Sequence, residues 1–191
     1  MKVALLVFGG FLVLVMLAAG TFWFSMRFSD GPKGPIPGGE LRSGELVDAT
    51  HIQWDEVLGD QSIAEIELQL ENPVSSRTTG AFVHNGKLYV PCDLGYVWRR
   101  LPDGSARLML HTIWFFKDWH EKISIDGRVV IRVEGKRYKL NAVRVIEDEL
   151  NSQFRERIST AAGEFFELLP VKTDPKEIWF FRLDARSENT S

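Results

Sequence analysis

The strongest hydrophobic pattern in the chain is an uninterrupted apolar run near its N-terminal end. The segment Val3–Met26 contains no charged side chain and lies between the two charged residues Lys2 and Arg27. At about 1.5 Å per helical residue, the run is long enough to cross a hydrocarbon layer of about 30 Å. The pattern therefore predicts a transmembrane anchor over residues 1–26.

A cleaved secretory signal is the alternative interpretation of this run, since Ala18-Ala19-Gly20 is a small-residue site of the kind at which signal peptides are cut. The apolar run continues past that site through Phe24, however, and Trp23 stands near the end of the run, where interfacial rings are favoured. We therefore expect an uncleaved, single-pass signal anchor. The very short N-terminal tail favours a globular part outside the cytoplasm.

The polar segment after the anchor is rich in Gly and Pro, above all from Ser29 to Gly39. Such a composition supports neither a helix nor a central strand, so residues 27–45 are predicted to be a partly extended linker. The rest of the chain, residues 46–191, is long enough for one globular domain and hardly for two.

Alternating apolar and polar residues predict strands in the first part of this domain. Residues 64–71 alternate without a fault, which predicts a half-buried strand that ends at Asn72-Pro73. Residues 78–90 predict a hairpin around Asn85-Gly86, because this dipeptide tolerates the positive φ angles of a type I′ turn.

The second part of the domain combines a hairpin, helices and a last strand. Residues 129–145 predict a hairpin that turns at residues 134–136, with a bulge where the apolar phase changes at Val143. Apolar spacings of three and four over residues 148–169 predict an amphipathic helix. Residues 106–122 fit either a buried helix or a strand pair, and we favour the helix. Residues 178–183 form a last predicted strand.

This order of elements predicts an α+β domain, a small antiparallel barrel with two covering helices behind the transmembrane helix. We expect the apolar residues on the inward faces of these strands and helices to be buried together in one core. These positions are Ile66, Leu68, Phe82, Leu88, Val90, Ile131, Val133, Phe154, Ile158 and Phe180.

Several of these motifs resemble the split β-barrel superfamily that includes pyridoxamine-phosphate oxidases and deazaflavin-dependent nitroreductases. The similar residues are the strand around residues 65–68, the segment 75–79, the hairpin 82–90, the stretch 117–120 and the hairpin after Asp126. The resemblance covers about residues 60–146. It implies an FMN or deazaflavin cofactor and oxidoreductase-like chemistry, and with the apolar run near the N-terminal end it makes the chain a membrane-anchored member of this group. It also implies a homodimer, because these barrels commonly pair.

Two clusters carry the candidate ligand chemistry. The segment Ser75–Thr79 places Arg77 among hydroxyls that include Ser76 and Thr78, in what the pattern predicts to be a turn, and such donors suit a phosphate. An ordinary polar turn is the alternative. Lys117 and Trp119 are candidates to contact an anion and stack on a ring, at the other edge of the same cleft. A Lys at the rim of an aromatic cluster is the alternative there.

Charge and motifs exclude several other functions. A formal net charge of −3 argues against nucleic acid as the main partner. No His or Cys spacing suits a metal site, and none of the common nucleotide or hydrolase motifs is present. The sequence leaves two functions open: a membrane-anchored barrel that binds a flavin-like or other anionic ligand, and a non-enzymatic interaction or assembly module at the membrane surface. The bilayer is the one partner expected in both.

Overall fold

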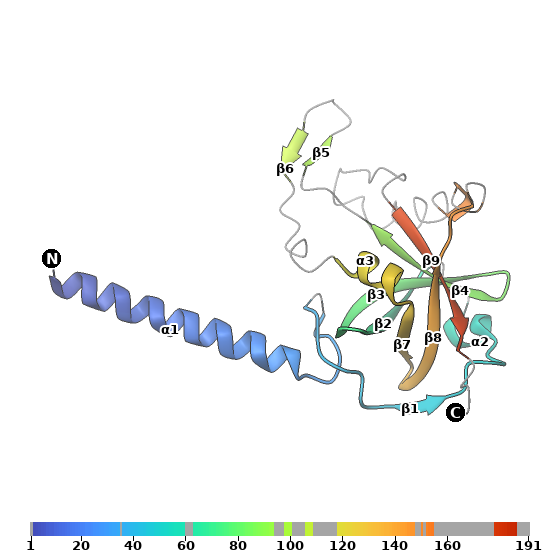
Figure 1. The fold of residues 1–191 in the computed structure, drawn as a ribbon, viewed down its shortest axis with the longest axis horizontal. Coiled ribbons are helices and arrows are strands. Elements are labelled where there is room, and N and C mark those ends of the chain that lie inside the picture. The colour runs from blue at the N-terminus through green and yellow to red at the C-terminus, as the bar shows by residue number, and fades with distance from the viewer. Residues whose placement is uncertain are drawn as a thin grey trace.

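The computed structural model consists of one long helix joined to a closed barrel (Figure 1). It describes residues 2–34, 36–59, 63–93, 98–100, 106–108, 118–147, 150, 152–154 and 178–186.

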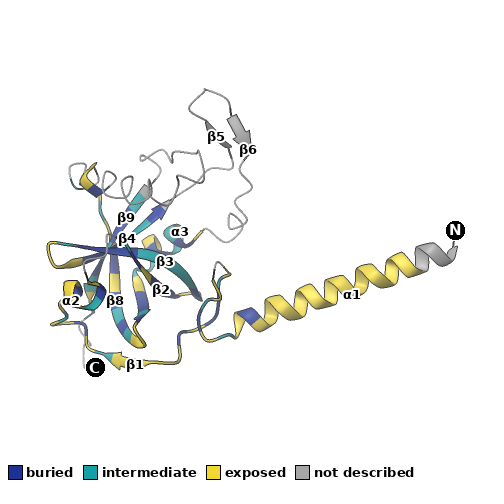
Figure 2. Cartoon of the chain, turned by 180° about the vertical axis from the view of Figure 1, so that it is seen from behind, coloured by how far each residue is buried: buried dark blue, intermediate teal, exposed yellow. Residues whose placement is uncertain are grey.

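Helix α1 (Lys2–Arg27) stands away from the barrel, and its described side chains are exposed up to its last turn (Figure 2). By its length and apolar composition, the stretch Val7–Arg27 can cross a membrane. Met26 differs from its neighbours, because it is only 4% exposed. The helix is therefore apolar all round, and its C-terminal end meets the barrel.

Six antiparallel strands form the barrel. They are β2 (Ala64–Glu71), β3 (Val74–His84), β4 (Lys87–Asp93), β7 (Arg128–Val133), β8 (Lys136–Arg144) and β9 (Ile178–Ala185). They pair in the order β8-β7-β2-β3-β4-β9, and β9 also pairs with β8, which closes the sheet on itself. Strand β1 (Glu45–Val47) adds to β8 in parallel. The predicted fold class is confirmed.

Two tight turns fix the hairpins. Asn85 and Gly86 join β3 to β4 with φ angles of 51° and 71°, as the sequence predicts for a type I′ turn. Glu134 and Gly135 join β7 to β8 with φ angles of 50° and 74°. The predicted bulge at Val143 is wrong, because β8 pairs with β9 in unbroken register through this position. Val143 belongs to the outer face of β8, and Val145, just after the strand, packs against the cluster around Phe82.

Short helices cover the barrel. Helix α2 (Trp54–Leu58) buries Trp54 and Leu58 against the interior cluster, and Trp54 packs edge-on to Tyr138 at 5.2 Å. Helix α3 (Trp119–Ile125) buries Trp119 and Ile123. The helix expected over residues 106–122 is wrong at Ala106–Leu108, which is strand β6 paired with β5 (Trp98–Arg100), and correct from Trp119, where α3 begins. Residues 109–117 lie outside the described residues.

The expected core is divided between two faces of the sheet. Ile66, Leu68, Leu88 and similar positions fill the barrel interior, whereas Phe82, Tyr89, Phe154 and Phe180 form a separate cluster outside it. Phe154 is 1% exposed there and lies 4.7–5.3 Å from the other three rings. A single shared core was therefore the wrong expectation. Ile158 and most of the helix predicted over 148–169 lie outside the described residues.

Candidate functional site

The segment predicted as a phosphate-binding turn is part of strand β3. The turn before it consists of Asn72-Pro73 alone, and pairing with β2 begins at Val74. Side chains in a strand alternate between faces. Arg77 pairs with Leu68 and shares the interior face, whereas Ser76 and Thr78 belong to the outer face. The three residues expected at one ligand edge are thus divided between the two sides of the barrel wall.

The side chain and the backbone of Ser76 both form hydrogen bonds with other residues of the chain. It is fully buried, and its hydroxyl donates to the Gly39 carbonyl at 2.6 Å. Its backbone exchanges hydrogen bonds of 2.9 and 3.0 Å with Gly38. We call residues 27–45, which follow α1, the juxtamembrane segment, and Ser76 attaches this segment to β3 instead of facing an open surface.

Arg77 and Trp119, which the sequence interpretation assigned to opposite edges of one cleft, lie in contact with each other. The Arg77 guanidinium lies 5.6 Å from the centre of the Trp119 ring, within cation–π range. Burial lowers the pKa of Arg77 to about 10, although Asp118 and Cys92 act against this shift. Trp119 is 4% exposed and packs on Phe181 at 5.7 Å. Lys117 lies outside the described residues.

The structure also contains a second Arg–Trp pair at this end of the barrel, which the sequence interpretation did not predict. The Arg144 guanidinium lies 3.3 Å from the centre of the Trp179 ring, and His120 meets the same ring edge-on at 5.3 Å. Since α3 begins with Trp119 and His120, it contacts both pairs. The signal was present in the strand alternation, because Arg144 continues the inward phase of Leu140 and Ala142.

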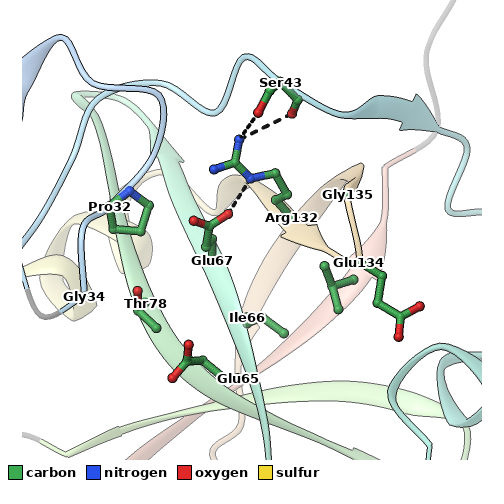
Figure 3. A pocket seen from close by; sticks show the side chains of 11 residues that line it. Pro32, Gly34, Ser43, Glu65, Ile66, Glu67, Thr78, Arg132, Glu134 and Gly135 are labelled. Atoms are coloured by element: carbon green, nitrogen blue, oxygen red, sulfur yellow. Dashed lines mark hydrogen bonds and ion pairs between the residues drawn. The ribbon is translucent and has the colours of Figure 1, made fainter.

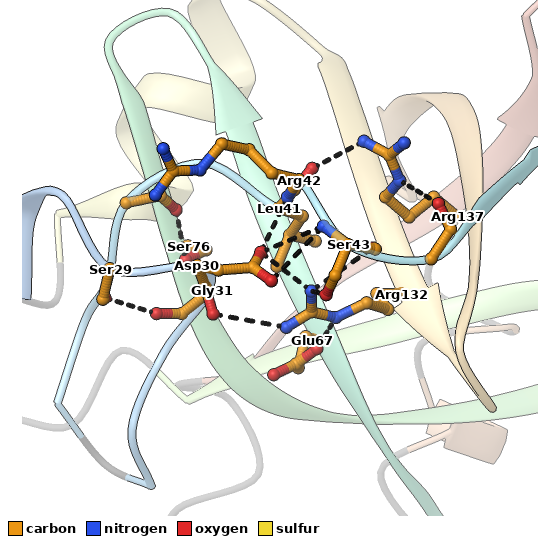
Figure 4. Close-up of polar contacts among 12 residues, drawn as sticks. Ser29, Asp30, Gly31, Leu41, Arg42, Ser43, Glu67, Ser76, Arg132 and Arg137 are labelled. Carbon is orange, nitrogen blue, oxygen red and sulfur yellow. Dashed lines mark hydrogen bonds and ion pairs between the residues drawn. The ribbon is translucent and has the colours of Figure 1, made fainter.

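The juxtamembrane segment, expected to behave as a spacer, lies against the outer face of β2 and β7. Its main attachment is Arg132, which bonds Glu67 through Nε and Asp30 through Nη1 at 2.9 Å (Figure 4). The same Nη1 donates to the Ser43 hydroxyl at 2.7 Å. Burial opposes ionisation of Asp30, but hydrogen bonds from Ser43, Arg42 and Arg132 outweigh it and lower its pKa well below the ordinary range. We call Asp30, Ser43, Glu67 and Arg132 the clamp.

Backbone groups of the segment are satisfied by the barrel as well. Leu41 is 1% exposed, and its amide donates to the Gln69 side-chain oxygen at 2.6 Å. The Leu41 carbonyl accepts from Arg137 at 2.8 Å. Gly38 passes so close to Gly31 that a Cβ would stand 1.8 Å from the Gly31 carbonyl oxygen. These contacts explain why Gln69, on the polar face of its strand, is buried.

A cavity of about 420 Å³ lies between this segment and the outer face of β2, β3 and β7 (Figure 3). Thr78 lines it, together with Glu65, Glu67 and Glu134. Its one cationic side chain, Arg132, is already bonded to Glu67 and to Asp30. The cavity is therefore unsuited to a phosphate, and Thr78 is placed away from Arg77. In the described part of the chain, no group of three or more His, Cys, Asp or Glu residues is arranged to hold a metal ion.

Comparisons with known proteins add solved structures but no family. No protein-family model and no curated protein matches the chain. A putative pyridoxamine 5′-phosphate oxidase from Listeria innocua is similar at 8% identity and a TM-score of 0.39, over 69% of this chain and 90% of that one. An FAD-binding protein from Mesorhizobium loti is similar at 10% identity and a TM-score of 0.42, over 70% of this chain and 87% of that one. The fold assignment rests on the strand order of the barrel itself.

Proposed function

We propose that this chain is a single-pass membrane protein whose barrel, held outside the cytoplasm, binds an anionic ring ligand of the flavin type beside Arg77 and Trp119. The supporting observation is the Arg77 guanidinium on the Trp119 ring, in a position where burial depresses the arginine pKa. Both residues were candidates from the sequence, and they come from distant parts of the chain.

The physical reason is the free-energy cost of a desolvated charge. A cation in a low-dielectric site is destabilised; Asp118 offsets part of that cost at Arg77, and a phosphate or another anion would add charge-assisted hydrogen bonds. An indole offers a flat surface on which a ring can stack. FMN and deazaflavin cofactors have both an anionic phosphate and a planar ring.

Arg144 and Trp179 form a second arginine–tryptophan pair at the same end of the barrel. Arg144 is exposed, and none of the described carboxylates forms an ion pair with it. It is therefore a second cation for the same ligand. A bound flavin would supply electron-transfer chemistry, while Arg77 and Arg144 would hold its anionic group and Trp179, which is only partly buried, would contact its ring.

A titration of FMN into the purified full-length chain tests the proposal. Arg77→Ala should weaken binding roughly ten- to a hundredfold, because a charge-assisted hydrogen bond is worth about 1.5–3 kcal/mol. Arg128→Ala is the matched control, since this arginine is 53% exposed and bonds Asp126 away from the pair. Equal affinities of the Arg77→Ala variant and the wild type, or no binding by the wild type, would contradict the proposed ligand site.

Membrane fractionation tests the anchor separately. The protein should remain with membranes after alkaline extraction, because α1 is uncleaved and crosses the bilayer. A soluble mature form beginning near Thr21 would show instead that the helix is a cleaved signal. Protease protection of the barrel in sealed vesicles reports on which side of the membrane it lies.

The second candidate function is a non-enzymatic assembly module. It is supported by the clamp, which holds the barrel in one orientation relative to α1 and so presents a fixed surface to a partner. A purified protein that is colourless and does not bind flavin favours this candidate.

A further inference from the structure

The juxtamembrane segment includes a small hairpin held by its own backbone. The Lys33 amide donates to the Ile36 carbonyl at 3.1 Å, and the Ile36 amide donates back to Lys33 at 3.2 Å. At its base, the Gly31 amide donates to the Glu40 carbonyl at 3.3 Å. The adjacent Gly38 pairs with Ser76 of β3, so the barrel holds the chain at the base of this hairpin.

The base of this hairpin is tied to the end of the membrane helix. Arg27 donates to the Val74 carbonyl on the barrel, and Arg42 donates to the Phe28 carbonyl at 2.7 Å. A Cβ on Gly39 would stand 2.5 Å from the Arg27 carbonyl oxygen, so this part of the segment touches the helix end. Along the axis of α1, the hairpin tip lies level with the C-terminal end of the helix (Figure 1).

The exposed side chains at this level have interfacial character. Phe28 is 61% exposed and packs on Phe24 at 4.7 Å, and Ile36 at the tip is 38% exposed. Lys33 is exposed beside Ile36. Aromatic and aliphatic groups next to a long cationic side chain are typical of the boundary between hydrocarbon and headgroups.

We propose that the Lys33–Ile36 hairpin tip, together with Phe28, forms a second membrane contact that seats the barrel on the headgroup layer. The proposal rests on α1 crossing the bilayer, as proposed above. The occupant is lipid, because the patch is continuous with the membrane helix and lies at the depth of its last turn. Ile36 and Phe28 alone give too little area for a stable protein interface, which needs about 800 Å² on each partner.

Site-directed fluorescence on the full-length chain in vesicles tests this contact. A bimane label on Ile36→Cys reports the tip, and nitroxide-bearing phosphatidylcholine in vesicles containing phosphatidylglycerol is the quencher. Leu46→Cys is the matched control, because this aliphatic residue is 46% exposed on β1, farther from α1 along the helix axis (Figure 1). Phe22→Cys inside α1 is the control for membrane insertion. The native Cys92 is 1% exposed and therefore shielded from the reagent.

The expected result is lipid quenching and a blue-shifted emission at position 36, with neither at position 46. Lys33→Glu should reduce quenching at position 36 in the anionic vesicles, because it replaces attraction to the headgroups by repulsion. Quenching at position 22 without quenching at position 36 would overturn the second contact and leave the anchor intact. No quenching at position 22 would overturn the anchor itself. Protection from aqueous iodide without lipid quenching would show that a second copy of the chain covers the tip, and would also overturn the proposal.

Discussion

Replacing Arg132 by Gln is expected to have two effects: it lowers the stability of the barrel, and it releases the juxtamembrane segment from the barrel surface. The arginine side chain is 13% exposed, and its partners Glu67 and Asp30 are 28% and 34% exposed. The variant removes the charge that both carboxylates face, while leaving a neutral side chain of similar length. Glu67 and Asp30 then lose their counter-charge in a partly desolvated position.

The size of this effect lies between two known limits. Solvent-exposed ion pairs contribute about 0.2–1 kcal/mol, whereas removal of one partner from a fully buried pair costs about 3–5 kcal/mol. Arg132 is nearly buried and its partners are about one-third exposed, so we expect a loss of about 2–3 kcal/mol in the free energy of unfolding. Asp30→Asn should cost less, because Glu67 and Ser43 still bond the arginine.

Urea unfolding of the full-length protein in detergent measures the first effect, and hydrogen exchange of residues 27–43 measures the second. Arg128→Gln on the same strand is the control, because this arginine is 53% exposed and, among the described residues, bonds only one carboxylate, Asp126, so it should lower the urea midpoint less than Arg132→Gln. Equal midpoints for the Arg132→Gln and Arg128→Gln variants would refute the reasoning. So would unchanged amide protection of residues 27–43 in Arg132→Gln.

Three further predictions concern packing, pH and the segment backbone. Phe154→Ala should lower the free energy of unfolding by about 3–5 kcal/mol, since the ring is fully enclosed by other rings, and an unchanged urea midpoint would count against this packing. The hydrogen bond from Arg186 lowers the pKa of Glu71 below its ordinary value. This pair therefore contributes its full stabilisation above the ordinary pKa of a glutamate, and the contribution is lost as acid protonates the carboxylate. Glu71→Gln should flatten this part of the pH profile of the free energy of unfolding. Gly38→Ala should speed proteolysis of the juxtamembrane segment, because its Cβ collides with the Gly31 carbonyl, and wild-type cleavage rates would exclude the collision.

Local chemistry was sufficient to predict the strands and their hairpins. Residues 64–71 alternate because one face meets the barrel interior, and the structure places β2 over these same residues. The Asn85-Gly86 turn depends on the φ angles of two residues, which the sequence specifies directly. The division of the core was harder to predict. Phe180 and Phe181 are neighbours buried on opposite faces, and only the outer cluster around Phe154 explains the first of them.

The candidate site was predicted only in part because its contacts are distant in sequence. Trp119 at the start of α3 meets Arg77 of β3 although 42 residues separate them in the chain, and no local pattern reports such a contact. Ser76 was misplaced because five polar residues were taken as a turn, although Asn72-Pro73 alone makes it. The docking of residues 27–45 depends on partners such as Gln69 and Arg132, whereas the Gly and Pro content of the segment indicates only an irregular backbone.

The position of β9 between β4 and β8 has a consequence for the order of folding. Strands β2 to β8 precede β9 in the chain, so the edges of β4 and β8 that pair with β9 remain unpaired until residues 178–185 have been synthesised and have joined the sheet. Open edges of this kind recruit strands from other chains. A copy truncated before Ile178 is thus expected to aggregate. Strand β1 covers only the Lys136–Tyr138 part of the β8 edge, so the part of β8 that pairs with β9, and the edge of β4, stay open in such a copy.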